Sequence, residues 1–278
     1  MLGAIYGDIV GSRFEPSNIN KDELNEDFVL FHQNCRFTDD TLMTLAVAES
    51  LVLTRNNPLL YQDTLVRVMK KYGKEYPGAG WGRNFYKWLS SEHYYQQDSY
   101  GNGAAMRISP VGWVCDSLED TIDLSRKTTE ITHNHPEGIK GAEAVAVAIY
   151  LARTGSSMDD IKKKMIEYYP EIANLTYKTI RATYEMSENG EWITCQGSVP
   201  QAIVAFLEST SLEDAVRKAV MYGADTDTQG AIAGSIAEAY YGFTYSEEDK
   251  VLSYLNPELQ SAYLAFNLIK KKRIKRTD

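Results

Sequence analysis

Apolar residues recur along most of this chain at intervals of three and four positions, which is the spacing of one face of an α-helix. The apolar runs are bounded by Gly, Pro, Asn or Asp, and few segments alternate with the period of two that a half-buried strand requires. The pattern therefore predicts an all-α protein. The expected helices cover residues 2–12, 40–55, 58–73, 82–91, 117–131, 137–153, 158–167, 176–188, 197–209, 211–222, 227–241 and 257–272.

Two of these helices are apolar around most of their surface. Residues 142–152 read AEAVAVAIYLA and residues 231–239 read AIAGSIAEA, and small residues on every side predict burial at the centre of a helical bundle. Gly7 and Gly11, four positions apart, allow the first helix to pack closely against a neighbour. No Gly/Ser-rich or Pro-rich linker and no fixed repeat divides the chain, so we expect a single domain over residues 1–278.

Composition narrows the class of partner. The chain has 278 residues, and its apolar share of 44% is sufficient for a substantial core. Its 29 basic and 38 acidic residues give a net charge of -9, whereas nucleic-acid-binding proteins concentrate positive charge to displace counterions. We therefore expect no nucleic-acid partner, and we expect any phosphate to be held by metal ions or backbone amides.

The cysteines and the apolar runs indicate the compartment. Cys35, Cys115 and Cys195 are odd in number, far apart and without a CxxC pair, so neither a disulfide framework nor a zinc site is predicted. The N-terminal segment has no basic stretch before its apolar run, and no uncharged run is long enough to span a bilayer. We expect a soluble, cytoplasmic protein with no membrane partner.

Two clusters of carboxylates and hydroxyls stand at predicted helix starts, FTDDT at residues 37–41 and GADTDT at residues 223–228. Helix capping uses one or two side chains and leaves the other members of each cluster unexplained. Hard oxygen ligands of this kind suit Mg²⁺, Mn²⁺ or Ca²⁺ better than zinc or copper. If the clusters meet, two cations about 3.5–4 Å apart would neutralise them. The alternative is two unrelated caps at separate corners.

Three further motifs are candidates for ligand contact. The SYGNGAAMR segment at residues 99–107 has two glycines around an Asn, and free amides at a turn entering a helix can cradle a phosphate. His133 belongs to a His-x-His pair without a third His or a Cys to complete a zinc site, so it either contacts a ligand or caps a helix. Glu15, next to Pro16 at the end of the first helix, is either solvated or turned toward the acidic clusters.

Two motifs have a structural interpretation. Ser198 followed by Gln201 has the spacing of a capping box at a helix start. The basic run KKKRIKR at residues 270–276 is typical of a cationic last helical turn, which complements the helix dipole, with a nucleic-acid or membrane patch as the alternative.

Together the motifs resemble the ADP-ribosylglycohydrolase family. GDIVGSRFEP, FTDDT, SYGNGAAMR, THNHPEG and GADTDT follow one another over nearly the whole chain, and their order and combination are more specific than any one of them. The resemblance implies an orthogonal all-α bundle with two Mg²⁺ ions, or Mn²⁺, in a cleft. It also implies hydrolysis of the glycosidic bond between ADP-ribose and a modified acceptor, so the expected partner is ADP-ribose or an ADP-ribosylated protein.

The resemblance also assigns roles by position. Glu15 would match a catalytic glutamate, and Glu15 or the metal-site Asp39 would serve as general acid or base. His133 would match a ligand-contacting histidine, and Tyr94 an aromatic residue on the adenine side. The metal ligands would be Thr38, Asp39, Asp40, Asp225, Asp227 and Thr228. The loop that holds the diphosphate and distal ribose would be Ser99, Tyr100, Gly101, Asn102 and Gly103.

Other functions remain open at this level. The same fold would serve a hydrolase of another ADP-ribosyl compound, such as an ADP-ribose ester, poly(ADP-ribose) or a modified nucleic-acid end. An ADP-ribose-binding immunity module that blocks a toxin transferase is a non-enzymatic alternative, and a plain helical scaffold is a third. No motif assigns the acceptor or the oligomeric state.

Overall fold

The computed structural model describes residues 1–15, 23–92, 97–186 and 190–274, and these ranges contain helices and no strand. The predicted all-α class is confirmed. The helices are α1 (Leu2–Gly11), α2 (Asp39–Leu53), α3 (Tyr61–Glu75), α4 (Arg83–Ser90), α5 (Gly103–Met106), α6 (Ser109–Val114), α7 (Leu118–Thr129), α8 (Pro136–Arg153), α9 (Met158–Tyr168), α10 (Tyr177–Met186), α11 (Cys195–Leu207), α12 (Leu212–Val220), α13 (Thr226–Tyr241), α14 (Tyr245–Leu252) and α15 (Pro257–Asn267).

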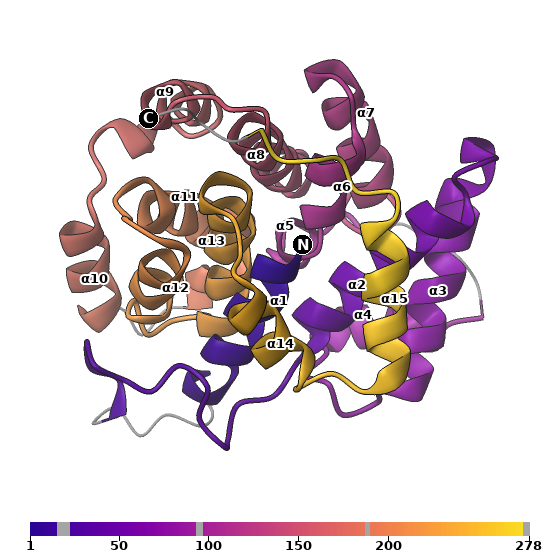
Figure 1. The fold of residues 1–278 in the computed structure, drawn as a ribbon, viewed down its shortest axis with the longest axis horizontal. Coiled ribbons are helices and arrows are strands. Elements are labelled where there is room, and N and C mark those ends of the chain that lie inside the picture. The colour runs from indigo at the N-terminus through magenta and orange to yellow at the C-terminus, as the bar shows by residue number, and fades with distance from the viewer. Residues whose placement is uncertain (16–22, 93–96, 187–189, 275–278) are drawn as a thin grey trace.

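Two helices from opposite ends of the chain form the centre of the bundle. All ten residues of α1 are buried, and α13 is buried over most of its length, so both lie in the middle of the ribbon (Figure 1). The remaining helices surround them, with α8 and α11 against one side of α13 and α2 against α1. The prediction that the small-residue helices α8 and α13 are central is confirmed.

Glycines set the distance between α1 and α13. Gly3, Gly7 and Gly11 face the backbone of Gly234, Gly230 and Thr226 in turn, and a Cβ on any of the three would overlap a carbonyl group of α13. Close packing through Gly7 and Gly11 is thus confirmed, and the neighbour is α13. The contact also brings Asp8 of α1 beside Asp227 at the acidic start of α13.

The start of α11 corrects one prediction. Its N-cap is Thr194, whose side chain accepts a hydrogen bond from the Gly197 N–H (3.1 Å), so the Ser198–Gln201 capping box is wrong. Ser198 is fully buried inside the helix and donates its hydroxyl to the Thr194 carbonyl (2.7 Å). The helix starts early because Cys195 N–H donates to the Tyr100 carbonyl (2.9 Å), which fixes the chain against the SYGNG loop.

The C-terminal helix is shorter than predicted. α15 ends at Asn267, and the chain beyond it crosses the molecule, with Lys271 N–H donating to the Trp113 carbonyl (2.9 Å). The basic run is therefore no last helical turn. Lys270 pairs with Glu238 (3.0 Å) and Lys271 with Asp116 (2.9 Å). The short helices α5, α6 and α14 were not predicted, because segments of four to eight residues carry too little periodicity.

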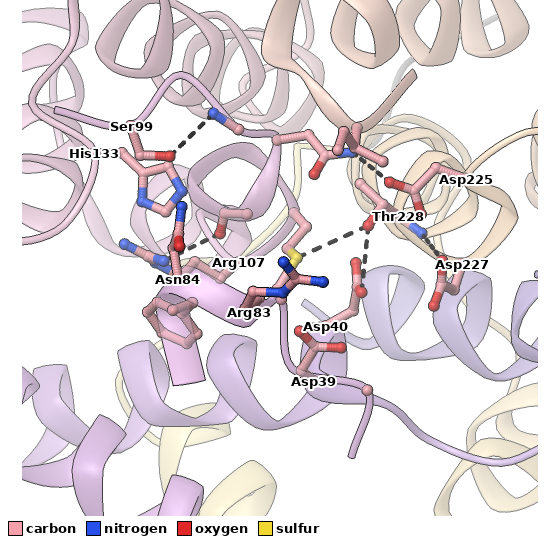
Figure 2. Close-up of a pocket in the computed structure, with 18 of the residues that line it drawn as sticks. Asp39, Asp40, Arg83, Asn84, Ser99, Arg107, His133, Asp225, Asp227 and Thr228 are labelled. Atoms are coloured by element: carbon pink, nitrogen blue, oxygen red, sulfur yellow. Dashed lines mark hydrogen bonds between the residues drawn. The ribbon is translucent and has the colours of Figure 1, made fainter. Parts of the chain in front are cut away.

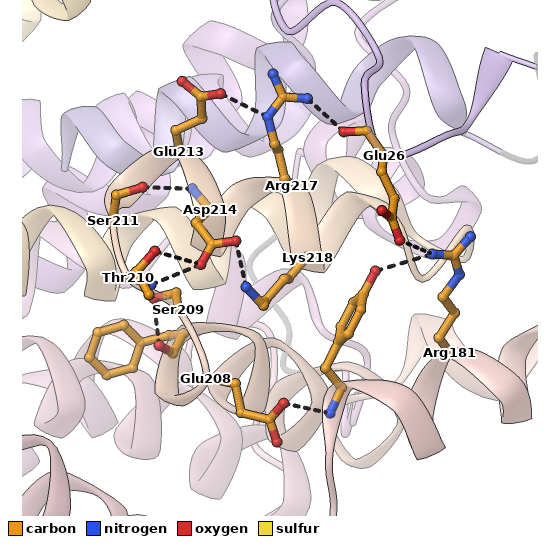
Figure 3. Close-up of polar contacts among 12 residues, drawn as sticks. Glu26, Arg181, Glu208, Ser209, Thr210, Ser211, Glu213, Asp214, Arg217 and Lys218 are labelled. Carbon is orange, nitrogen blue, oxygen red and sulfur yellow. Dashed lines mark hydrogen bonds and ion pairs between the residues drawn. The ribbon is translucent and has the colours of Figure 1, made fainter.

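The segment between α1 and α2 is held by α10 and α12, as Figure 3 shows. Arg217 of α12 donates to the carbonyl groups of Glu26 (3.4 Å) and Phe28 (2.8 Å) while it pairs with Glu213. Arg181 of α10 lies 3.9 Å from the Glu26 carboxylate. These contacts fix the path by which the chain returns to the start of α2. None of the helices in the described ranges has the combined length and apolarity that crossing a bilayer requires.

Candidate active site

Most of the residues that the sequence singled out line one cavity of about 670 Å³. This size is typical of a small-molecule site. Figure 2 shows the acidic side chains on one side of the cavity and Ser99, His133 and Arg107 on the other. The predicted site residues that line it are Glu15, Asp39, Asp40, Ser99, Gly101, Asn102, Gly103, His133, Asp225, Asp227 and Thr228.

Two predicted residues are placed differently. Thr38 is buried and does not line the cavity; its hydroxyl caps α2 by accepting from the Asp40 N–H (3.3 Å), and it lies 3.4 Å from the Asp40 carboxylate and 3.5 Å from the Asp227 carboxylate. Tyr100 is 47% exposed, and its ring packs against His135 with 5.2 Å between ring centroids. Tyr94 lies outside the described residues.

Asp8 is the acidic residue that the sequence interpretation missed. Its two oxygens accept hydrogen bonds from the Thr38 N–H (2.9 Å), the Thr38 hydroxyl (2.7 Å), the Thr41 N–H (3.1 Å) and the Thr41 hydroxyl. These donors belong to the first turn of α2, so Asp8 anchors the helix start that presents Asp39 and Asp40. The signal was present in the sequence: Asp8 is the one charged side chain in a helix that is otherwise apolar.

The two acidic clusters meet. Carboxylate oxygens of Asp8, Asp40 and Asp227 lie within 4.8 Å of one another, and all three residues are buried. Thr228 donates its hydroxyl to Asp40 (3.3 Å), so the start of α13 also contacts the start of α2 directly. The alternative of two unrelated caps is excluded.

Capping explains only part of each cluster. Asp225 occupies the N-cap position of α13 but makes no side-chain capping bond there. Its carboxylate instead accepts a hydrogen bond from the Asn102 side chain (2.6 Å), which ties the SYGNG loop to the acidic centre. Asp40 Oδ1 is buried and has no hydrogen-bond partner among the described residues. A buried carboxylate oxygen without a partner is costly unless a cation or a proton satisfies it.

Burial and mutual repulsion raise the pKa values of several carboxyl groups at the site. Burial, followed by the charge of Asp227, raises the pKa of Asp8 to about 7. The same two causes raise the pKa of Asp39 and of Asp40 well above the usual range. Burial, followed by a hydrogen bond with Asp227, raises the pKa of Glu15 to about 9. The group is a set of carboxylates that needs protons or cations to coexist.

A hard divalent cation fits this donor set. The oxygens come from carboxylates and hydroxyls alone, the Asp40 Oδ1 atom lacks a partner, and no Cys or His belongs to the Asp8–Asp40–Asp227 group. Both carboxylate oxygens of Asp8 accept hydrogen bonds from the start of α2. Asp40, Asp227 and the Thr38 and Thr228 hydroxyls remain for ligation.

Internal hydrogen bonds fix the SYGNG loop at residues 99–103. The Gly101 N–H donates to Ser99 Oγ (3.2 Å), and the Asn102 N–H donates to the Ile193 carbonyl (3.0 Å). These two amides are therefore committed inside the protein and are not free for a phosphate, contrary to the expectation from the sequence. His133 is 5% exposed, its Nδ1 pairs with the Thr132 hydroxyl (2.7 Å), and burial followed by the Arg107 charge lowers its pKa well below the usual value. Both causes favour the neutral imidazole, which can still form hydrogen bonds.

Other cavity residues carried no motif. The loop before α4 approaches the acids: the Asp39 N–H donates to the Ala79 carbonyl (2.9 Å), and Gly80 has a φ of +101° with its Cβ position 3.1 Å from Asp39 Oδ1. Arg83 and Trp192 also line the cavity.

Comparisons with known proteins identify the family. The family model described as ADP-ribosylglycohydrolase matches residues 1–249. The protein is 26% identical to human ADP-ribosylhydrolase ARH3 over 312 residues, covering 87% of this chain and 84% of the relative. It is 24% identical to ADP-ribosylarginine hydrolase Tri1 of Pseudomonas putida, covering 87% of this chain and 69% of that relative.

A solved structure supports the fold. The chain described as an ADP-ribosylglycohydrolase-related protein complex superposes with a TM-score of 0.62 at 24% identity, and the match covers 96% of each chain. The family model spans the N-terminal acid-bearing helix, both acidic clusters and the SYGNG loop. This protein therefore belongs to the ADP-ribosylglycohydrolase family of glycosidic-bond hydrolases.

Proposed function

We propose that this protein reverses ADP-ribosylation by hydrolysing the bond between the distal ribose of ADP-ribose and a modified acceptor, with Mg²⁺ at a two-ion centre. The observation that carries the proposal is the convergence of Glu15, Asp40 and Asp227, from three distant parts of the chain, on one cavity. We further propose that residues 1–278 act as a single domain.

The acidic residues of the site have two roles, holding the cations and positioning the helices that carry the ligands. A divalent centre, when bound, supplies charge stabilisation and lowers the pKa of water. Asp40, Asp227, Thr38 and Thr228 would hold it, joined by Asp39 and Asp225 from the cavity wall. Asp8 keeps the start of α2 in place through its four hydrogen bonds.

Glu15 has the properties of a general acid. Its raised pKa, about 9, keeps it protonated near neutral pH, and it lines the cavity together with Asp227. In hydrolysis, the proton of Glu15 passes to the departing acceptor atom as the bond from the anomeric carbon breaks. Asp39 then accepts a proton from the attacking water, whose oxygen forms the new bond to that carbon.

The test is a hydrolase panel with arginine-, serine- and ester-linked ADP-ribose, each measured with Mg²⁺ and with EDTA. We expect release of ADP-ribose from at least one substrate in Mg²⁺ and loss of that activity in EDTA and in Asp227→Asn. Absence of turnover on every linkage, together with retained ADP-ribose binding, would instead identify a binding module. Full activity in EDTA would contradict the metal centre.

A further inference from the structure

The charges on the cavity wall are unevenly distributed. Five carboxylates line it, and Figure 2 shows the four labelled aspartates gathered on one side. Two guanidinium groups line the same cavity, Arg83 and Arg107, and the Arg83 side chain points into it between the aspartates and the His133 side. A ligand that fills this cavity therefore contacts carboxylates at one end and guanidinium groups beside that end.

The two arginines are not equivalent. Arg107 is 1% exposed and donates to the Gly103 carbonyl (3.1 Å) and the Thr132 hydroxyl (2.7 Å), so it is fixed beneath the loop. Arg83 is the first residue of α4 and is exposed. No carboxylate of the described chain lies within 4.0 Å of its guanidinium group. Arg83 is thus the cation that remains available to a ligand.

A diphosphate in this cavity would be favoured by such a cation. Two amides of the loop at residues 99–103 that the sequence suggested for phosphate binding, those of Gly101 and Asn102, are already used within the protein. Bound cations would offset the negative charge of the acidic wall but not extend to the α4 side of the cavity, and ionised carboxylates without them would repel two phosphate charges. A guanidinium fork matches phosphate oxygens in two-bond geometry, whereas the SYGNG loop offers neutral groups.

We propose that Arg83 binds the diphosphate of the ADP-ribosyl substrate and thereby places its distal ribose against the acidic centre. The inference rests on the proposed function, because the substrate class is taken from it. Arg83 acts on binding and positioning and takes no part in bond breaking. Arg83 also sets the orientation of the substrate: the diphosphate is held beside α4, and the distal ribose extends toward Asp40 and Asp227.

The test compares wild type with Arg83→Gln and Arg83→Lys by calorimetric titration of ADP-ribose, ADP and adenosine in the presence of Mg²⁺. Arg67→Gln is the matched control, since Arg67 lies on α3, is exposed and does not line the cavity. We expect Arg83→Gln to weaken ADP-ribose and ADP about tenfold, the order of one charge-assisted bond. Adenosine affinity should stay at the wild-type value, and Arg83→Lys should recover part of the loss.

Salt provides a second readout. The advantage of wild type over Arg83→Gln for ADP-ribose should shrink as NaCl rises from about 50 to 500 mM, because an exposed ion pair is screened. Equal ADP-ribose affinity of wild type and Arg83→Gln would overturn the inference while leaving the proposed function intact. An equal loss of adenosine affinity would also overturn it. Failure of wild type to bind ADP-ribose or to hydrolyse any linkage would overturn the proposed function itself.

Discussion

Asp8 and Thr38 are thirty positions apart, yet Thr38 donates both its backbone N–H (2.9 Å) and its hydroxyl (2.7 Å) to the Asp8 carboxylate. Thr41 adds a second pair of donors to the same carboxylate. The start of α2 is thus oriented by a side chain of α1, and α1 is in turn locked onto α13 by its glycines. The two acidic clusters meet because α1 contacts both helices that carry them, α2 through the Asp8 carboxylate and α13 through its glycines.

The first prediction removes that carboxylate. Asp8→Asn keeps the size of the side chain but replaces one acceptor oxygen by an NH₂ group, which faces the donors of Thr38 or Thr41 and cannot accept from them. We expect metal affinity to fall by about 10–100-fold, the usual effect of losing an outer partner of a ligand set. Mg²⁺ titration followed by thermal unfolding measures the change, and activity at saturating Mg²⁺ should recover in part.

Two variants bracket this result. Thr41→Val removes one hydroxyl donor and should give a smaller loss in the same direction. Asp63→Asn changes an exposed aspartate of α3 and should leave metal affinity at the wild-type value. If Asp8→Asn matches Asp63→Asn, Asp8 has no influence on the site.

The second prediction concerns the α1–α13 contact. Gly7→Ala places a methyl group in the backbone of Gly230, so the helices must separate. We expect a loss of about 1–3 kcal/mol of unfolding free energy, typical of an overpacked core. Metal-induced stabilisation should also fall, because Asp8 and Asp227 move with the helices. Gly78→Ala is the control, since its Cβ would meet no atom within 4 Å. Equal unfolding free energies of the two variants would contradict the packing argument.

The helices could be predicted because their apolar period is local. Every helix of eight or more residues except α14 was located, and the acidic clusters were recognised by residue type alone. Gly7 and Gly11 were correctly interpreted as a close-packing surface, since their spacing needs no knowledge of the partner.

The features that could not be predicted depend on contacts between distant parts of the chain. Asp8 was missed because its four donors lie thirty or more positions away, and Arg83 because the cavity exists only after α4 and α13 are placed. Thr194 replaced Ser198 as a cap because the chain before α11 bonds to Tyr100. The Asn102 amide of the SYGNG loop is occupied by the Ile193 carbonyl, some ninety positions on, which local sequence does not reveal.

The third prediction tests Glu15. Glu15→Gln preserves size and hydrogen bonding but has no transferable proton, so kcat should fall by about 10²–10⁴-fold with ADP-ribose affinity retained. Because the protonated form is the active acid and burial raises its pKa to about 9, wild-type activity should decline as pH rises through that pKa. Bound Mg²⁺ moves the decline to lower pH by favouring the carboxylate.

The pH profile distinguishes this role from a structural one. Glu15→Gln should lack the alkaline decline that wild type shows, whereas Glu119→Gln, an exposed glutamate of α7, should keep the wild-type rate and profile. An alkaline limb that persists unchanged in Glu15→Gln would assign the ionisation to another group.

The last prediction concerns stability. Burial and the Asp227 charge raise the pKa of Asp8 to about 7 from an unfolded value near 4, and they raise those of Asp39 and Asp40 as well. In the metal-free protein the folded state therefore binds more protons than the unfolded state across about pH 4–7, and stability falls as pH rises through that window. A cation removes this penalty at the upper end, where the carboxylates are ionised.

We therefore expect Mg²⁺ at about 100 times its dissociation constant to raise Tm by about 5–10 °C at pH 8, equivalent to about 2.7 kcal/mol. The gain should be much smaller at pH 5, where protons compete for the same oxygens. Scanning calorimetry with Mg²⁺, and with NaCl at matched ionic strength, separates ligation from screening. Asp227→Asn removes a ligand and part of the repulsion, so its metal-free Tm should depend less on pH, and its gain with Mg²⁺ should be lost. A gain of the same size at both pH values, or with NaCl alone, would rule out cation binding by these carboxylates.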